Sequence, residues 1–193
     1  MKTRWPLCTL MVLSMSVLAS MWPAAVEALI YDRQAIQVGE VWRLLSGHLV
    51  HFSSAHLVGD LLVFGIAGYL IERQLGRQVG WLYLAMSAVI GLSLWVLDPA
   101  LARFGGLSGL AYGNVFYMVA SMAHQHTPAR PVAVALLIVL LLKIFRDFCE
   151  PASVLDVLTP QPFVTVPLSH LVGVLMAGTF FIITTKENNH VPA

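Results

Sequence analysis

Long apolar runs separated by short polar breaks make up most of this chain of 193 residues. A helix needs about 20 mainly apolar residues to cross a bilayer, because no water is present there to satisfy exposed backbone groups. Breaks such as Asp98-Pro99 and Thr127-Pro128 divide the runs. Six stretches qualify as spans, at about 6–28, 56–73, 79–97, 106–123, 131–149 and 164–184. The pattern predicts an all-α membrane protein, a compact bundle of six transmembrane helices forming one domain over residues 1–193.

The composition supports a lipid environment and removes several classes of function. The chain is 58% hydrophobic and 11% charged, with a mean hydropathy of +0.79, values at which a soluble domain would aggregate. A net charge of +1 provides no basic field for nucleic acid. Cys8 and Cys149 lie far apart in apolar surroundings, which indicates neither a disulfide framework nor a zinc knuckle. No phosphate loop, EF-hand loop or HExxH run occurs, and we predict no cofactor.

Basic residues indicate how the bundle is oriented. Those that would share one face of a six-span topology are Lys2, Arg4, Arg73, Arg77, Arg130 and Lys186. The opposite loops carry Arg33, Arg43, Arg103, Lys143 and Arg146, with Asp32, Glu40, Asp98, Asp147, Glu150 and Asp156 beside them. Because cytoplasmic loops are enriched in Lys and Arg, this bias predicts that both termini are cytoplasmic.

The first stretch has a second interpretation. Lys2 and Arg4 precede an apolar run containing Leu18-Ala19-Ser20, as in a secretory signal peptide. We favour an uncleaved span, and the cleaved signal stays open. In both cases residues 29–55 form an external loop, whose Trp42, Arg43 and apolar residues suit a segment lying in the membrane interface.

Few ionisable side chains fall within the predicted spans, and each is costly enough to indicate a function. His56 and Asp60 lie on the second span, Ser108 begins the fourth, and His170 lies on the sixth. Since these three spans would all run from outside to inside, His56, Ser108 and His170 should lie at comparable depth near the outer face. Hydropathy and charge alone therefore predict one layer of polar groups.

Ser108 lies in a glycine-rich stretch with Gly105, Gly106 and Gly109 around it. Such a stretch can leave backbone N–H groups free at a helix N-terminus, where they stabilise an oxyanion while a nearby histidine takes the serine proton. His170 is the natural general base at the same depth. Glycine and serine clusters in spans also mediate helix packing, and that alternative stays open.

The histidines near the second span allow two interpretations. His56 and Asp60 are four residues apart and share a helix face, where the carboxylate could fix the imidazole tautomer. His48 and His51 could join His56 in a metal site. Three histidines in an interfacial segment are too little to assign one, and we predict no metal.

Four short motifs, in order from Trp42 to Gly173, resemble the rhomboid intramembrane serine proteases. Trp42-Arg43 resembles the family's first-loop WR motif, and His51-Phe-Ser-Ser-Ala-His56 its histidine pair at the head of the second span. Gly106-Leu-Ser-Gly109 matches GxSG, and Ser169-His170-Leu-Val-Gly173 resembles AHxxG with Ser in place of Ala.

The resemblance implies roles for these residues. Ser108 would be the nucleophile and His170 its base, with Tyr112 stacked against His170. His56 and the Ser108 backbone would form the oxyanion hole, and Gly106 would lie in the packed approach to the serine. Trp42, Arg43 and His51 would be structural residues of the first loop.

Asp60 departs from the family, in which most members have Asn at this position. An ionised carboxylate would repel the developing negative charge, so we expect Asp60 to be neutral or paired with His56. The sequence His56-Leu-Val-Gly-Asp60 and the short six-span form most resemble the rhombosortase branch.

That resemblance implies an intramembrane serine endopeptidase of a bacterial inner membrane whose active site opens toward the periplasm. Its partners would be proteins with a GlyGly-CTERM anchor, which consists of a Gly-rich motif, a hydrophobic helix and a basic tail. An acyl-enzyme would be resolved by water or by another acceptor, and the sequence leaves both open. The alternatives are a catalytically inactive rhomboid-like protein that binds membrane clients and, from another class, a histidine-based metal or proton carrier.

Overall fold

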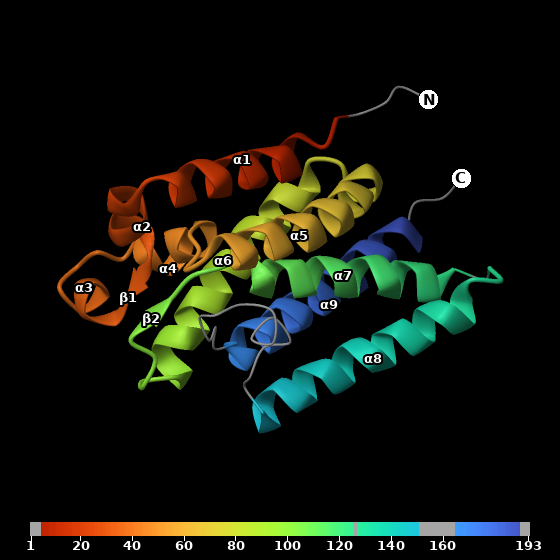
Figure 1. The fold of residues 1–193 in the computed structure, drawn as a ribbon. Coiled ribbons are helices and arrows are strands. Elements are labelled where there is room, and N and C mark those ends of the chain that lie inside the picture. Colours follow the sequence, from red (N-terminus) through yellow and green to blue (C-terminus); the bar gives the residue numbers. More distant parts are fainter. Residues whose placement is uncertain (1–4, 126, 151–164, 190–193) are drawn as a thin grey trace.

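The computed structural model describes residues 5–125, 127–150 and 165–189. Lys2, Arg4 and Asp156, which entered the charge pattern, lie outside the described residues. Six helices of 15 residues or more form the bundle: α1 (Leu7–Met21), α5 (Ser54–Leu75), α6 (Gln78–Leu97), α7 (Ser108–His124), α8 (Arg130–Cys149) and α9 (Pro167–Asn189). The predicted all-α membrane bundle is confirmed (Figure 1).

Within the described residues, three helices are long and apolar enough to cross a membrane, namely α5, α6 and α9. A fourth span results if α1 and α2 (Pro23–Leu29) are counted as one. Helix α7 has only 17 residues, and α8 carries Lys143, Arg146 and Asp147 near its end. The described helices thus follow the predicted order, but only some of them are long and apolar enough to cross a membrane alone.

The first predicted stretch, 6–28, is not one straight helix. Helix α1 ends at Met21, and α2 leaves it at an angle of 115°. Pro23 explains the break, since a residue before proline is disfavoured in the helical region and Trp22 is extended, with φ −118° and ψ 121°. Hydropathy could not reveal this bend because α1 and α2 together are apolar enough to pass as one span.

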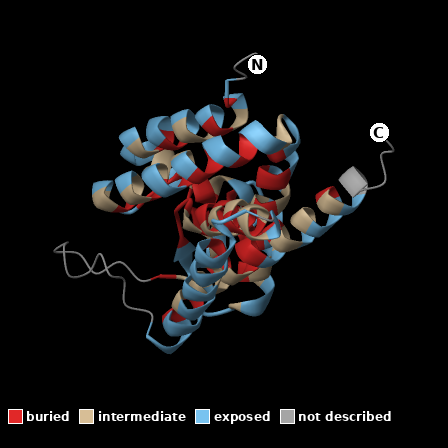
Figure 2. Cartoon of the chain, turned by 90° about the vertical axis from the view of Figure 1, so that its right-hand side faces the viewer, coloured by how far each residue is buried: buried red, intermediate tan, exposed pale blue. Residues whose placement is uncertain are grey.

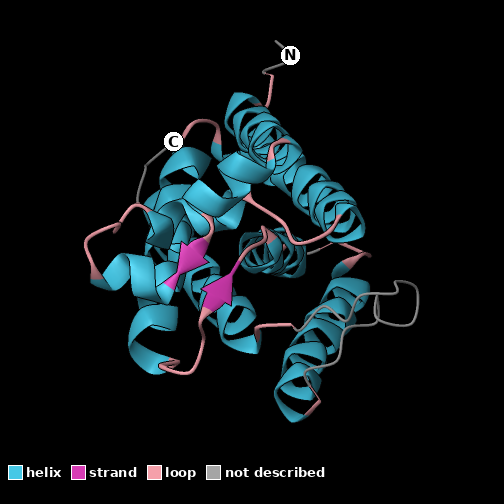
Figure 3. Cartoon of the chain, turned by 60° about the vertical axis from the view of Figure 1, so that its left-hand side comes forward, coloured by secondary structure: helices cyan, strands magenta, loops and turns pink. Residues whose placement is uncertain are grey.

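The external loop is folded into short elements: β1 (Tyr31–Asp32), α3 (Arg33–Gln37), α4 (Arg43–Ser46) and the 3-10 turn η1 (Gly47–Leu49). Strand β1 pairs antiparallel with β2 (Arg103–Phe104), which precedes α7 (Figure 3). Arg43 fastens α4 to α2, as its guanidinium donates to the backbone oxygens of Glu27 and Ile30 at 2.7 and 2.9 Å. The loop is therefore tied to the segment that leads into Ser108.

Helix α7 lies at the centre of the bundle and packs against α5, α8 and α9. Buried residues gather in the middle, and exposed residues cover the outer surfaces of the helices (Figure 2). Many of the exposed side chains are large and apolar, such as Ile66, Trp81 and Phe145. An apolar exterior is what a helix bundle surrounded by lipid requires.

Candidate active site

Ser108 is the first residue of α7, the position where free N–H groups of a helix gather. Gly106 approaches it with φ +137°, a conformation that L side chains rarely adopt. A Cβ at Gly106 would also lie 2.6 Å from Cε1 of His56. Only glycine fits here, so this residue lets the backbone before the serine touch the head of α5.

His170 lies in the first turn of α9 and faces Ser108. Its Nε2 is 3.1 Å from the Ser108 hydroxyl oxygen, and only 3% of the residue is exposed. Tyr112, one turn after Ser108, stacks on the imidazole with ring centroids 3.9 Å apart and an interplanar angle of 2°. The stack fixes the plane of the ring, and the serine contact fixes its direction.

Three glycines bring the two helices close enough for this contact. A Cβ at Gly173 of α9 would collide with the carbonyl oxygen of Gly109 of α7. A Cβ at Gly113 would lie 2.8 Å from the Gly173 oxygen. Glycine allows such backbone approach in membrane helices. The packing alternative for the glycine cluster and a catalytic use of Ser108 are thus compatible, because the packing makes the dyad geometry.

A second cluster lies at the head of α5, beside Gly106. One carboxylate oxygen of Asp60 is 3.0 Å from Nε2 of His51 and 3.2 Å from Nε2 of His56. The backbone N of Leu107 is 3.3 Å from the same His51 nitrogen. Since a carboxylate can only accept, the closer contact favours a His51 Nε2–H that donates to Asp60.

The structure separates the three histidines that the sequence offered for a metal site. His51 and His56 have ring centroids 4.9 Å apart, whereas His48 turns to the backbone oxygen of Ser87 at 3.1 Å. Burial lowers the pKa of His48 to about 4, which keeps it neutral. The atoms of His51, His56 and Asp60 lie within 4.8 Å of one another, a spacing that could hold an ion. Their mutual contacts through Asp60 already account for the spacing.

Two of the predicted loop residues lie apart from this cluster and hold the loop. The indole N–H of Trp42 donates to the oxygen of Ala28 at 3.2 Å, and half of this side chain is exposed. Arg43 is buried and, besides its backbone contacts, pairs with Glu40 at 2.6 Å. His51, in contrast, lies within the polar cluster.

Sequence reasoning missed a buried carboxylate, Asp147. It was counted among the charges of an external loop, but it lies on α8 and its side chain is fully buried. Its Oδ2 is 2.6 Å from Nζ of Lys143 and 3.6 Å from Nδ1 of His170. The signal was available, since Lys143 and Asp147 are four residues apart inside the predicted span 131–149.

Three further buried polar residues were also missed, namely Thr9, Glu72 and Asn114. Glu72 of α5 accepts hydrogen bonds from the backbone N of Cys8 and of Thr9, at 2.9 and 2.8 Å, and so caps α1. The Thr9 hydroxyl also donates to Glu72 and contacts the hydroxyl of Tyr83, to which Asn114 donates at 3.4 Å. This chain of contacts holds α1, α5, α6 and α7 together.

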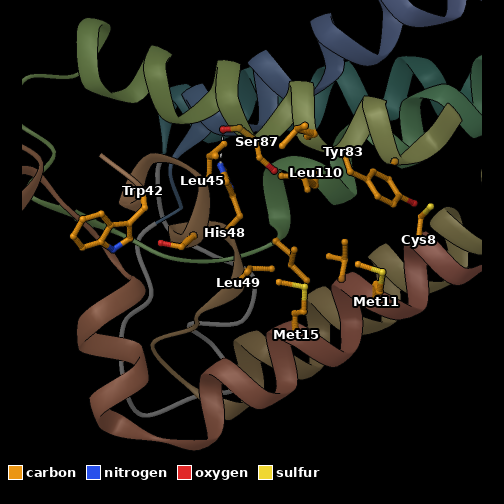
Figure 4. Close-up of a pocket in the computed structure, with 15 residues that line it drawn as sticks. Cys8, Met11, Met15, Trp42, Leu45, His48, Leu49, Tyr83, Ser87 and Leu110 are labelled. Carbon is orange, nitrogen blue, oxygen red and sulfur yellow. Dashed lines mark hydrogen bonds between the residues drawn. The ribbon is translucent and has the colours of Figure 1, made fainter. Parts of the chain in front are cut away.

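The pocket in Figure 4 lies on another side of the segment that carries the serine. It has a volume of about 430 Å³ between α1, α4 and α6, and Leu107 and Leu110 form part of its wall. Met11, Met15 and other apolar side chains dominate its lining, which suits hydrocarbon. The described lining residues include neither Ser108 nor His170.

Comparison with known proteins identifies the family. The model of the rhomboid domain matches residues 38–187. The chain is 40% identical over 90 residues to "Rhomboid protease GlpG" of Haemophilus influenzae, covering 46% of this chain and 45% of that protein. It is 32% identical over 124 residues to "Rhomboid-related protein 2" of Mus musculus, covering 59% and 41%. The matches thus span less than half the length of these relatives. The chain is an integral membrane protein and belongs to the rhomboid family.

Proposed function

We propose that the chain is an intramembrane serine endopeptidase in which Ser108 is the nucleophile and His170 the general base. The observation that carries the proposal is the 3.1 Å contact between the Ser108 hydroxyl and Nε2 of His170 at the start of α7. A nucleophile within hydrogen-bond reach of a base that is itself held in place is the geometry required for acyl transfer. The relatives named as rhomboid proteases support the same activity.

Negative charge would develop on the substrate oxygen near the N-terminus of α7. The N–H of Ser108 and the imidazole of His56 are the donors that we assign to this oxyanion. Gly106 lets His56 come close to the backbone before the serine. The contacts of Asp60 with His51 and His56 support a role in orienting the two rings rather than in binding the oxyanion.

The reaction would proceed in two steps. The Ser108 oxygen forms a bond to the substrate carbonyl carbon and its proton moves to Nε2 of His170. As the C–N bond breaks, His170 gives this proton to the leaving amine. Water, or an amine of another molecule, then attacks the acyl carbon while His170 takes its proton. The bond from this carbon to the Ser108 oxygen breaks, and His170 returns the proton to that oxygen. A substrate helix must unwind first, since its hydrogen-bonded backbone shields its peptide bonds.

We further propose that the substrates are proteins with a C-terminal anchor made of a Gly-rich motif, a hydrophobic helix and a basic tail. A Gly-Gly pair near the cleavage site would unwind readily because glycine disfavours a helix. The His56-to-Asp60 sequence, which resembles the rhombosortase branch, supports this class. The setting would be a bacterial inner membrane, with both termini cytoplasmic and the site opening to the periplasm.

The test is reconstitution of the protein in vesicles with a Gly-Gly-anchored substrate. Wild type should release the anchor, and Ser108→Ala and His170→Ala should not. A fluorophosphonate probe should label wild type and leave Ser108→Ala unlabelled, which tests the nucleophile without any assumption about the substrate. Absence of both cleavage and labelling in the folded wild type would favour the inactive, client-binding alternative. Labelling without cleavage would reject only the anchor class.

A further inference from the structure

Two contacts described above hold the imidazole of His170. Nε2 faces Ser108, and Tyr112 covers one face of the ring. The remaining nitrogen, Nδ1, is buried and makes no hydrogen bond to any of the described residues. Buried donors and acceptors are rarely left alone, so this nitrogen should have a nearby partner.

Asp147 is the charged group that faces this nitrogen. Its Oδ2 lies 3.6 Å from Nδ1, slightly beyond a hydrogen bond but within reach of a small ring movement. Contacts in a catalytic group are often long in the free enzyme and shorten when substrate binds. Helix α8 ends at the same end of the bundle where α7 and α9 begin (Figure 1), so its last turn, which carries Asp147, is the part of α8 that can reach His170.

Asp147 pairs with Lys143 and, through its other oxygen, lies 3.5 Å from the guanidinium of Arg146, whose side chain is 48% exposed. These two ion pairs with exposed partners do not by themselves explain why Asp147 is buried. Lys143 binds Oδ2 at 2.6 Å, yet 39% of the lysine side chain is exposed and none of the aspartate is. A helical Lys–Asp pair is stable at a surface, and burying one partner is unfavourable without a further contact. Apart from Ala133 and Ile144, Asp147 is the only buried residue among the described positions of α8. The contact with His170 is the further interaction that accounts for the burial of this carboxylate.

We propose that Asp147 is a positioning residue that makes the dyad a Ser108–His170–Asp147 triad. The inference rests on the proposed protease function. The carboxylate accepts from Nδ1–H, which selects the tautomer whose Nε2 lone pair can take the serine proton. When that proton arrives, Asp147 stabilises the imidazolium. Lys143 and Arg146 supply the positive charge beside this carboxylate.

The proposal predicts how Ser108 reactivity changes in matched variants. Asp147→Asn is isosteric and should lower the rate of fluorophosphonate labelling by about 10- to 100-fold, less than the loss of about 10⁴ known for a directly bonded triad aspartate, because the contact is longer and shared with Lys143. Asp147→Glu should recover part of the rate. With a cleavable substrate, kcat should fall while KM changes little.

Two further variants distinguish positioning from a structural role. Lys143→Gln/Asp147→Asn removes the unpaired lysine along with the carboxylate, so it should restore the melting temperature but not the rate. Glu27→Gln is the matched control, since it removes an exposed carboxylate paired with Arg103 at 2.6 Å and should label like wild type. Equal labelling of Asp147→Asn and wild type, or recovery of the rate in the double variant, would overturn the triad.

A measurement on the unsubstituted protein covers the case in which these variants do not fold. The ¹⁵N spectrum of wild type, assigned with His170→Ala, should show a protonated Nδ1 and an unprotonated Nε2 in neutral His170. The opposite tautomer would reject the triad. The proposed function fails separately, if wild type itself is not labelled at Ser108.

Discussion

The close packing of α7 against α9 can be tested by adding one methyl group to Gly173. In Gly173→Ala the new Cβ would collide with the carbonyl oxygen of Gly109 and lie 3.0 Å from its carbonyl carbon. The obstacle is backbone on both sides, so no side-chain rotation can relieve it. The two helices must separate, and Ser108 and His170 lie on opposite sides of the gap.

The size of the effect follows from two distances. Carbon atoms in contact need about 3.5–4.0 Å, so the helices must move apart by about 0.5–1 Å. The distance from the Ser108 hydroxyl to Nε2 of His170 is 3.1 Å, and such a shift takes it beyond a hydrogen bond. A displacement of about 1 Å can reduce catalysis about 100-fold. Overpacking should also lower the free energy of unfolding by about 1–3 kcal/mol.

The assay is the rate of fluorophosphonate labelling of Ser108, measured together with the melting temperature in detergent. Gly178→Ala on the same helix is the control, since its Cβ would lie 3.2 Å from Cε1 of Phe116, a side chain that can turn aside. We expect a loss of labelling in Gly173→Ala at temperatures where it is still folded, and a smaller effect in Gly178→Ala. Wild-type labelling and melting in Gly173→Ala would refute the argument that glycine packing sets the dyad distance.

Three more predictions concern other residues. Asp60→Asn should keep or raise the cleavage rate, because an amide can still contact His51 and removes a charge that opposes the oxyanion; complete loss of cleavage would show that a specific acid is needed. Glu72→Ala should lower the free energy of unfolding by about 3 kcal/mol or more, since three hydrogen bonds to a carboxylate disappear, whereas an unchanged melting temperature would contradict its role as the cap of α1. Tyr112→Ala should slow labelling about 2- to 10-fold by loss of the stack, more than Tyr112→Phe; equal rates for both would exclude stacking.

Much of the arrangement could be predicted from the sequence because lipid imposes a simple requirement on it. Each backbone group must be satisfied within its own helix, so the apolar runs predict where the helices lie. Ser108 and His170 were detectable for a related reason, since polar side chains in such runs are rare. Asp147 was not recognised as a site residue because it was counted among the loop charges, although it belongs to α8. The bend at Trp22-Pro23 was not predicted because hydropathy is averaged over a window that contains residues on both sides of it.

The amino-acid pattern is enough to predict the kind of molecule, the order of its helices and the polar residues near one end of the bundle. Which of those residues touch depends on the three-dimensional packing. His51 joins His56 and Asp60, while His48 turns to α6. The reason is that depth along a span follows from local hydropathy, whereas proximity across the bundle depends on how closely the helices pack. For Ser108 and His170, that closeness comes from the glycines of α7 and α9, and α8 then adds a carboxylate beside them.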